Sequence, residues 1–131
     1  MTNTAKALYG FFSQFGIPAY PEGGVPTYTY DAQGNRAEVK PPYITYQVVR
    51  PNWRAQAPLY ARVWYRSTTY AEIGATVDAI AAAIGEGVSL PTEDGAVYLY
   101  QEDTFAQYQD MAGDATLKCA YLSMSIHALT T

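Results

Sequence analysis

The stretch from Pro42 to Gly85 constrains the fold most, because its hydrophobic period changes from two to 3.6 within one continuous segment. Residues 43–50 and 59–66 are rich in β-branched and aromatic side chains that alternate between two faces, which is typical of strands. Apolar residues then recur at helical spacing: Ile73, Val77, Ile80 and Ile84. The stretch therefore predicts strand, strand and helix, with the helix stripe packed on the sheet as the core.

Short end signals bound this helix and a second one at the start of the chain. Thr69 with Glu72 three residues later fits a capping box, and Gly85 fits a C-terminal stop. The opening segment carries another apolar stripe at helical spacing, made by Ala5, Leu8, Phe12 and Phe15. We expect this opening helix to end at Gly16.

The segments between and after the helices predict further strands and loops. Residues 17–26 hold three prolines and two glycines, so we expect a surface loop there. Threonine and tyrosine alternate over residues 27–30, and residues 33–35 form a turn sequence that leads back to residues 37–39. Residues 27–39 therefore predict an exposed hairpin with little to bury. Residues 87–95 are interpreted as a polar connection.

Three strands are expected after that connection, at 97–100, 105–111 and 116–129. The last one should bury Ala120, Leu122, Met124, Ile126 and Ala128. The predicted order is α-β-β-β-α-β-β-β. This order indicates an α+β fold, with two helices on one side of a largely antiparallel sheet. A chain of 131 residues suits one domain over residues 1–131.

Composition limits the class of protein. Hydrophobic residues make up 49% and tyrosine occurs 13 times, which favours a globular chain with half-buried faces suited to assembly. The single cysteine, Cys119, excludes an internal disulfide and is interpreted as a small hydrophobe in a strand. No signal peptide and no long apolar run is evident. We expect synthesis in a cytoplasm and no membrane partner.

Charge is divided unequally along the chain. Residues 1–66 hold seven basic and three acidic side chains, a net +4, whereas residues 67–131 hold one basic and nine acidic ones, a net −8. Two readings stay open. The halves form two solvated faces, or they form unlike surfaces that meet head to tail around a ring.

Candidate catalytic residues are few. His127 is the only histidine, and the carboxylate pairs Glu93-Asp94 and Glu102-Asp103 fall at expected strand ends or turns, where solvated side chains are the simpler interpretation. Gly85-Glu86-Gly87 is too short to cradle a phosphate. No cluster has the spacing of metal ligands. We therefore expect a protein that is not an enzyme and that has no cofactor and no metal.

One group of basic and aromatic side chains is dense enough to predict a contact surface. It comprises Arg50, Trp53, Arg54, Tyr60, Arg62, Trp64 and Arg66. Such residues can touch phosphate and stack on bases, but the isoelectric point is about 4.7, and nucleic-acid-binding domains are usually basic. Arginine and tryptophan are also enriched at protein interfaces. A subunit or partner interface is favoured, with no specific nucleic acid, and a nucleic-acid-binding module stays as the alternative.

The chain resembles the tail terminator, or minor tail protein, family of tailed bacteriophages and prophages. The resemblance is carried by the opening helix with Gly16-Ile17-Pro18-Ala19-Tyr20-Pro21, by Pro42-Tyr43-Ile44-Thr45-Tyr46, by the strand at 59–66 and by the helix from Tyr70 to Ile84. Relative to that family, the hairpin at 27–39 is an insertion.

The resemblance implies an α+β protein without catalytic residues that forms a hexameric ring, caps the tail tube, ends its growth and provides the joint to the head or neck. Implied partners are further copies of the chain, the tube protein and a head–tail connector or neck protein. The implied location is the virion tail or a phage-like particle. Another neck or tail-completion protein is the alternative within this class, and a small hydrolase using His127 is an alternative outside it.

Overall fold

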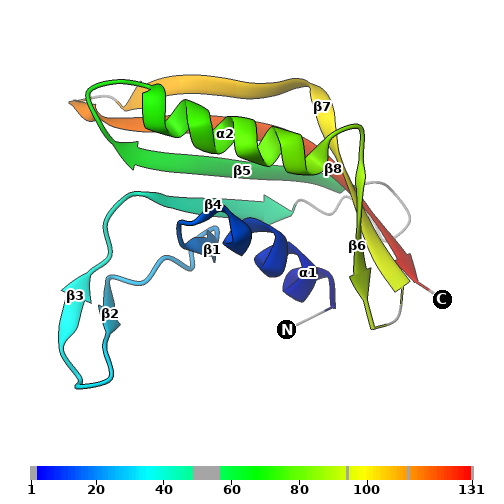
Figure 1. Cartoon of the computed structure of the whole chain (residues 1–131), viewed down its shortest axis with the longest axis horizontal. Coiled ribbons are helices and arrows are strands. Elements are labelled where there is room, and N and C mark those ends of the chain that lie inside the picture. The colour runs from blue at the N-terminus through cyan, green and yellow to red at the C-terminus, as the bar shows by residue number, and fades with distance from the viewer. Residues whose placement is uncertain (1–2, 49–56, 94, 112, 131) are drawn as a thin grey trace.

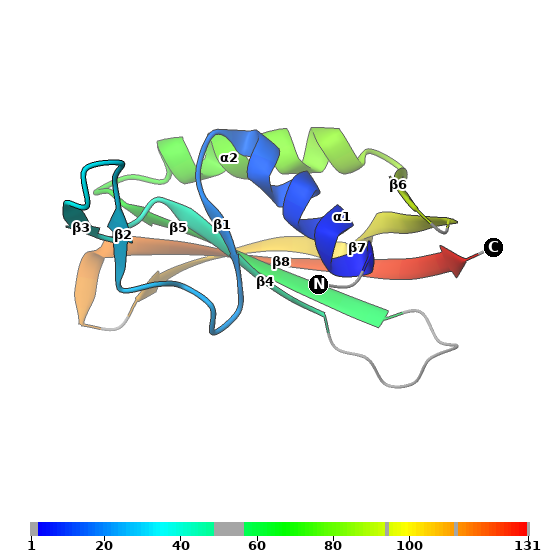
Figure 2. The same cartoon turned by 90° about the horizontal axis from the view of Figure 1, so that it is seen from below.

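The computed structural model describes residues 3–48, 57–93, 95–111 and 113–130. Helix α1 spans Asn3–Phe12 and continues into a 3-10 turn at Ser13–Phe15, and helix α2 spans Ala71–Ile84. Both helices lie on the same side of the main sheet, as Figure 2 shows. The protein is therefore a mixed α+β fold with one sheet face covered by helices.

The strands form two separate sheets. The main sheet has six strands in the order β1-β4-β5-β8-β7-β6 (Figure 1). Their bounds are Ala19–Pro21 for β1, Tyr43–Val48 for β4, Ala57–Arg66 for β5, Val88–Thr92 for β6, Gly95–Met111 for β7 and Asp114–Thr130 for β8. The second sheet contains β2, Tyr28–Tyr30, and β3, Arg36–Glu38.

The core lies between the helices and the covered face of the sheet. The predicted stripe of α2 is confirmed, since Ile73, Val77, Ile80 and Ile84 are all buried. Alternate residues of β5 and β8 meet this stripe from the sheet, and α1 adds Leu8, Phe11 and Phe12. Helix α1 contacts both edge strands, β1 and β6, so it closes the helix side of the curved sheet.

The predicted order of elements is wrong, because five strands precede α2 and the order is α-β-β-β-β-β-α-β-β-β. One of the two additional strands, β1, lies within residues 17–26, where a loop was expected; the other arises because the expected hairpin supplies two strands, β2 and β3. Strand β1 pairs with β4 in parallel, so the main sheet is mixed, although its other pairings are antiparallel. The Ile44 N–H donates to the Pro18 carbonyl and the Glu22 N–H to the Tyr46 carbonyl, each at 2.8 Å. Pairing with β4 thus orders a segment that has no strand pattern of its own.

Two further boundaries differ from the predictions in the second half of the chain. The polar connection expected at 87–95 contains β6, whose Val88 and Leu90 pack against the core. The two strands expected at 97–100 and 105–111 are one strand, β7, which changes register between Gln101 and Ala106. The bulge lets the chain keep pairing with β8 across residues that lack a clean alternation.

The sequence predicts the C-terminal end of α2 better than its N-terminal end. Gly85 ends the helix with φ of 56°, and its N–H donates to the Ala81 carbonyl at 2.9 Å. At the N-terminal end, the N-cap is Tyr70, which carries no side-chain cap hydrogen bond. The Thr69 hydroxyl accepts a hydrogen bond from the Ala71 N–H at 3.4 Å, so the predicted cap at Thr69 is present only in part. The helix begins one residue later than a cap at Thr69 requires.

The predicted hairpin at 27–39 is confirmed as β2 and β3, which we call the arm. Residues 27–38 are all exposed. The arm extends from the body beside β4 in Figure 1. Its strands pair with one another and not with the main sheet.

Candidate interaction surface

Strand β5 presents two unlike faces, as its alternation predicts. Leu59, Ala61, Val63 and Tyr65 are buried under the helices, whereas Tyr60, Arg62 and Trp64 are half-buried on the opposite side and Arg66 is exposed there. We call this opposite side of the main sheet the open face. Of the predicted interface residues, Arg50, Trp53 and Arg54 lie at 49–56, outside the described residues.

Aromatic side chains from four strands gather on the open face. The Trp64 indole N–H donates to the Thr45 hydroxyl oxygen at 3.2 Å. The Trp64 ring lies 6.5 Å from that of Tyr43, which in turn lies 6.0 Å from that of Tyr20. On the other side, the rings of Tyr60 and Tyr121 stack at 5.5 Å. The result is an aromatic surface assembled from β1, β4, β5 and β8.

Arg62 lies between these aromatic groups and is already partnered within its own chain. Its guanidinium lies 5.2 Å from the centroid of the Tyr121 ring and 3.4 Å from the Glu22 carboxylate. Because both members of the ion pair are more than a third exposed, the pair contributes only about 0–1 kcal/mol. Its effect is to hold the Arg62 guanidinium between Glu22 and the Tyr121 ring.

Arg66 joins the end of β5 to the turn between β7 and β8. Its guanidinium donates to the Asp114 carboxylate at 2.7 Å and to the Thr116 hydroxyl at 2.9 Å. The bond from Arg66 to Asp114, then the bonds that the Thr116 hydroxyl and N–H donate to the same carboxylate, lower the pKa of Asp114 to about 2. Arg66 is thus at the rim of the open face, with its charge engaged by its own chain.

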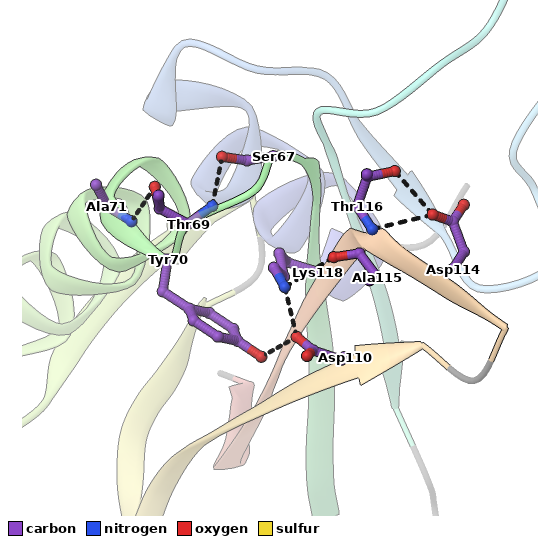
Figure 3. A network of polar contacts seen from close by, with 9 residues as sticks. All are labelled: Ser67, Thr69, Tyr70, Ala71, Asp110, Asp114, Ala115, Thr116 and Lys118. Carbon is purple, nitrogen blue, oxygen red and sulfur yellow. Dashed lines mark hydrogen bonds and ion pairs between the residues drawn. The ribbon is translucent and has the colours of Figure 1, made fainter.

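The acidic character of the second half of the chain is reinforced by the position of its one basic residue. Lys118 is buried on the helix side of β8, where its ammonium donates to Asp110 at 2.7 Å and to the Ala115 carbonyl at 2.8 Å. Asp110 also accepts a hydrogen bond from Tyr70, as Figure 3 shows. The bonds from Lys118, then from Tyr70, lower the pKa of Asp110. The exposed charge of this half is therefore almost wholly negative.

The residues considered for catalysis do not converge where the structure describes them. His127 is exposed near the end of β8, opposite Tyr98. Glu93 is exposed at the end of β6, and Asp94 lies outside the described residues. Glu102 and Asp103 do not lie at a strand end, as was expected, but in the bulge of β7, where Glu102 accepts a hydrogen bond from the Ser125 hydroxyl.

The bulge borders an open depression of about 380 Å³ beside Tyr60. Its lining includes Ser123 and Ser125 with both carboxylates, but not His127.

Within the described residues, no group of three or more His, Cys, Asp or Glu is arranged to hold a metal ion. Burial raises the pKa of the Cys119 thiol to about 11, so the thiol stays protonated and is a poor nucleophile.

Sequence reasoning missed the aromatic partners that other strands supply to the open face. Tyr121 falls on the correct face of its strand by alternation alone, but the pairing of β5 with β8 places it beside Tyr60 and Arg62. Tyr43 and Thr45 reach Trp64 through the pairing of β4 with β5. Strand-to-strand neighbours of this kind carry no local sequence signal.

Neither helix among the described residues has the length and apolar character needed to cross a membrane. Comparison with models of protein families and with curated proteins gave no match. The open face therefore has to be interpreted from its own chemistry.

Proposed function

We propose that the protein is a non-enzymatic structural protein of a phage or phage-like tail, acting as a tail terminator or a closely related neck component. The observation that carries the proposal is the open face, where half-buried Tyr60, Trp64 and Tyr121 lie on a sheet surface that neither helix covers. Large aromatic side chains with a polar group at one end suit a surface that is wet in the free chain and covered in an assembly. That the assembly is a ring on a tail tube is inferred from the sequence resemblance to tail terminators.

The proposed mechanism is steric. Copies of the chain associate head to tail into a ring, with a hexamer as the expected size, because repeating one heterologous contact closes a ring when the rotation permits it. The ring covers the exposed end of the tail tube, so further tube subunits cannot add. Its outer surface then receives a head–tail connector or neck protein.

The aromatic groups are expected to carry more of the contact energy than the arginines. Buried aromatic anchors dominate most interfaces, whereas rim charges act mainly on association rate and register. Arg62 and Arg66 also have partners within the chain, Glu22 and Asp114, which reduces what a neighbouring subunit could gain from them.

The test is an assembly assay in which purified protein is mixed with growing tail tubes. We expect the unmodified protein to form rings on tubes and stop their growth, and Trp64→Ala to weaken this more than Arg66→Ala. The double reversal of Arg62→Glu with Arg66→Glu should leave folded monomers, with folding checked by circular dichroism. If that protein still forms rings and stops tails at normal length, the open face is not the subunit contact.

A nucleic-acid-binding module is the second candidate, favoured by one observation. Arg62 lies over the Tyr121 ring, and Tyr60 stacks on the same ring. Proteins that bind single-stranded nucleic acid use this combination of a cation and aromatic rings. The net charge of −4 and the engaged arginines weigh against it. Salt-sensitive retention of a single-stranded oligonucleotide, lost in Tyr121→Ala, would favour this candidate over the ring.

A further inference from the structure

The arm is ordered by its own turn although it buries almost nothing. The Asp31 carboxylate accepts hydrogen bonds from the N–H groups of Gln33 and Asn35, both at 2.9 Å, and Gly34 provides the positive φ of 82°. The Arg36 guanidinium lies 4.5 Å from the centroid of the Tyr28 ring. A two-stranded hairpin is only marginally stable in water by itself, and added strands stabilise it.

Both edges of the arm carry backbone groups that point away from their partner strand. The Asp31 N–H bonds to the Asn35 carbonyl and the Val39 N–H to the Thr27 carbonyl, each at 2.9 Å. Antiparallel pairs alternate, so Tyr28 and Tyr30 on one strand, with Arg36 and Glu38 on the other, direct their N–H and C=O groups outward. Such an edge is a template for a further strand.

The edges of the main sheet are poor templates by comparison. At the β1 edge, Pro21 has no N–H to donate, and its carbonyl already accepts a hydrogen bond from the Gly24 N–H at 2.8 Å. At the β6 edge, Pro91 removes a donor and α1 packs against the strand. Strand β3, by contrast, lies on the side of the arm away from the body (Figure 1).

The sequence of β3 is complementary to itself in one register. When two copies of Arg36-Ala37-Glu38 run antiparallel about a two-fold axis at Ala37, each Arg36 faces a Glu38 of the other copy. Arg36 and Glu38 are also the residues of β3 whose backbone groups point outward, so the same register forms the backbone hydrogen bonds. Opposite charges directly across a strand pair are stabilising, and like charges are destabilising.

We propose that the arm is a self-association element, in which β3 pairs antiparallel with β3 of a second copy and the two hairpins form one four-stranded sheet. The contact is isologous, so it joins two subunits and stops. It does not rest on the proposed ring, which requires a heterologous contact on a different surface. A contact one strand wide is small, so we expect a dissociation constant on the order of 10–100 μM.

Charge reversal provides the test, using the full chain without tail tubes. Sedimentation velocity over a concentration series should show a monomer–dimer equilibrium for the unmodified protein. Arg36→Glu and Glu38→Arg should each raise the dissociation constant about tenfold or more, because each puts like charges opposite one another at two symmetric places. Lys40→Glu, a matched reversal just beyond β3, should leave the dimer unchanged.

Mixing the two single variants shows whether they lose dimerisation because of charge repulsion or because the substitution has disrupted the arm. In the mixed pair, the carboxylates of one chain face the guanidinium groups of the other, so the mixture should dimerise at concentrations where each variant alone stays monomeric. The double variant with Arg36→Glu and Glu38→Arg should also recover dimerisation. A native protein that stays monomeric at millimolar concentration, variants that dimerise like the native chain, or a mixture that stays monomeric would each overturn the proposal. If the unmodified protein forms this dimer but does not cap tail tubes, only the proposed ring is contradicted.

Discussion

The two faces of β5 differ in how they meet water, although they belong to the same strand. On the helix side, Leu59 and Val63 are 0% exposed and belong to the hydrophobic core. On the open side, Trp64 donates its indole N–H to Thr45 and Arg62 lies between Tyr121 and Glu22. Aliphatic side chains have no polar group to satisfy, so they suit permanent burial, whereas aromatic and arginine side chains can remain half wet.

The comparison separates the face that stabilises the fold from the face that keeps exposed side-chain area. The helix face carries the folding energy, because full burial of a large aliphatic side chain contributes about 1.5–3 kcal/mol before entropy is counted. The open face keeps exposed side-chain area, which on our proposal is buried against a second molecule and gives specificity for it. Substitutions on the two faces should therefore separate folding from association.

The largest effect is expected from a charge on the helix face. Ile80 is 0% exposed in the middle of the α2 stripe, so Ile80→Asp should place a carboxylate in the core and unfold the protein. Ala79 is exposed on the same helix, so Ala79→Asp should change little. Thermal melts followed by circular dichroism compare the two. Similar melts for both variants would mean that the face of α2 is wrongly assigned.

A smaller effect is expected on the free energy of unfolding when neighbouring residues of β8, on opposite faces, are truncated. Leu122 is 0% exposed on the helix face, and Leu122→Ala should lower the free energy of unfolding by about 2–5 kcal/mol. Tyr121 is half-buried on the open face and stacks on Tyr60, so Tyr121→Ala should cost only about 1–2 kcal/mol. Urea unfolding of the monomer measures both. An equal or larger cost at Tyr121 would contradict the division of roles between the faces.

The smallest effect concerns acid stability at the rim of the open face. Because the pKa of Asp114 is lowered from 3.8 to about 2, chiefly by the bond from Arg66, this carboxylate stabilises the folded state above pH 3.8. That stabilisation is lost as the pH falls from 3.8 to about 2. In Arg66→Gln, the urea midpoint should fall less steeply over this interval. A pH profile identical to that of the unmodified protein would mean that Arg66 does not hold Asp114 in solution.

The sequence by itself determined the elements whose pattern is local. The stripe of α2 and the alternation of β5 were predicted correctly because burial repeats every 3.6 or every two residues along the chain. The exposed hairpin was also predicted, since residues 27–39 offer little to bury and contain a turn sequence. The order of elements was not, because β1 is short and has a weak pattern of its own. The short strand β6 was missed for the same reason, while two expected strands are the single strand β7.

The tertiary structure decided which strands are neighbours, and with that the composition of the open face. Glu22 meets Arg62, and Tyr121 meets Tyr60, only because β1, β4, β5 and β8 lie side by side in this order. Strand β1 is itself held by hydrogen bonds with β4 and packs beneath α1. These contacts are distant in sequence, so their free energy is gained only when the whole sheet forms. Local periodicity assigns a side chain to a face, but only the assembled sheet assigns its neighbours.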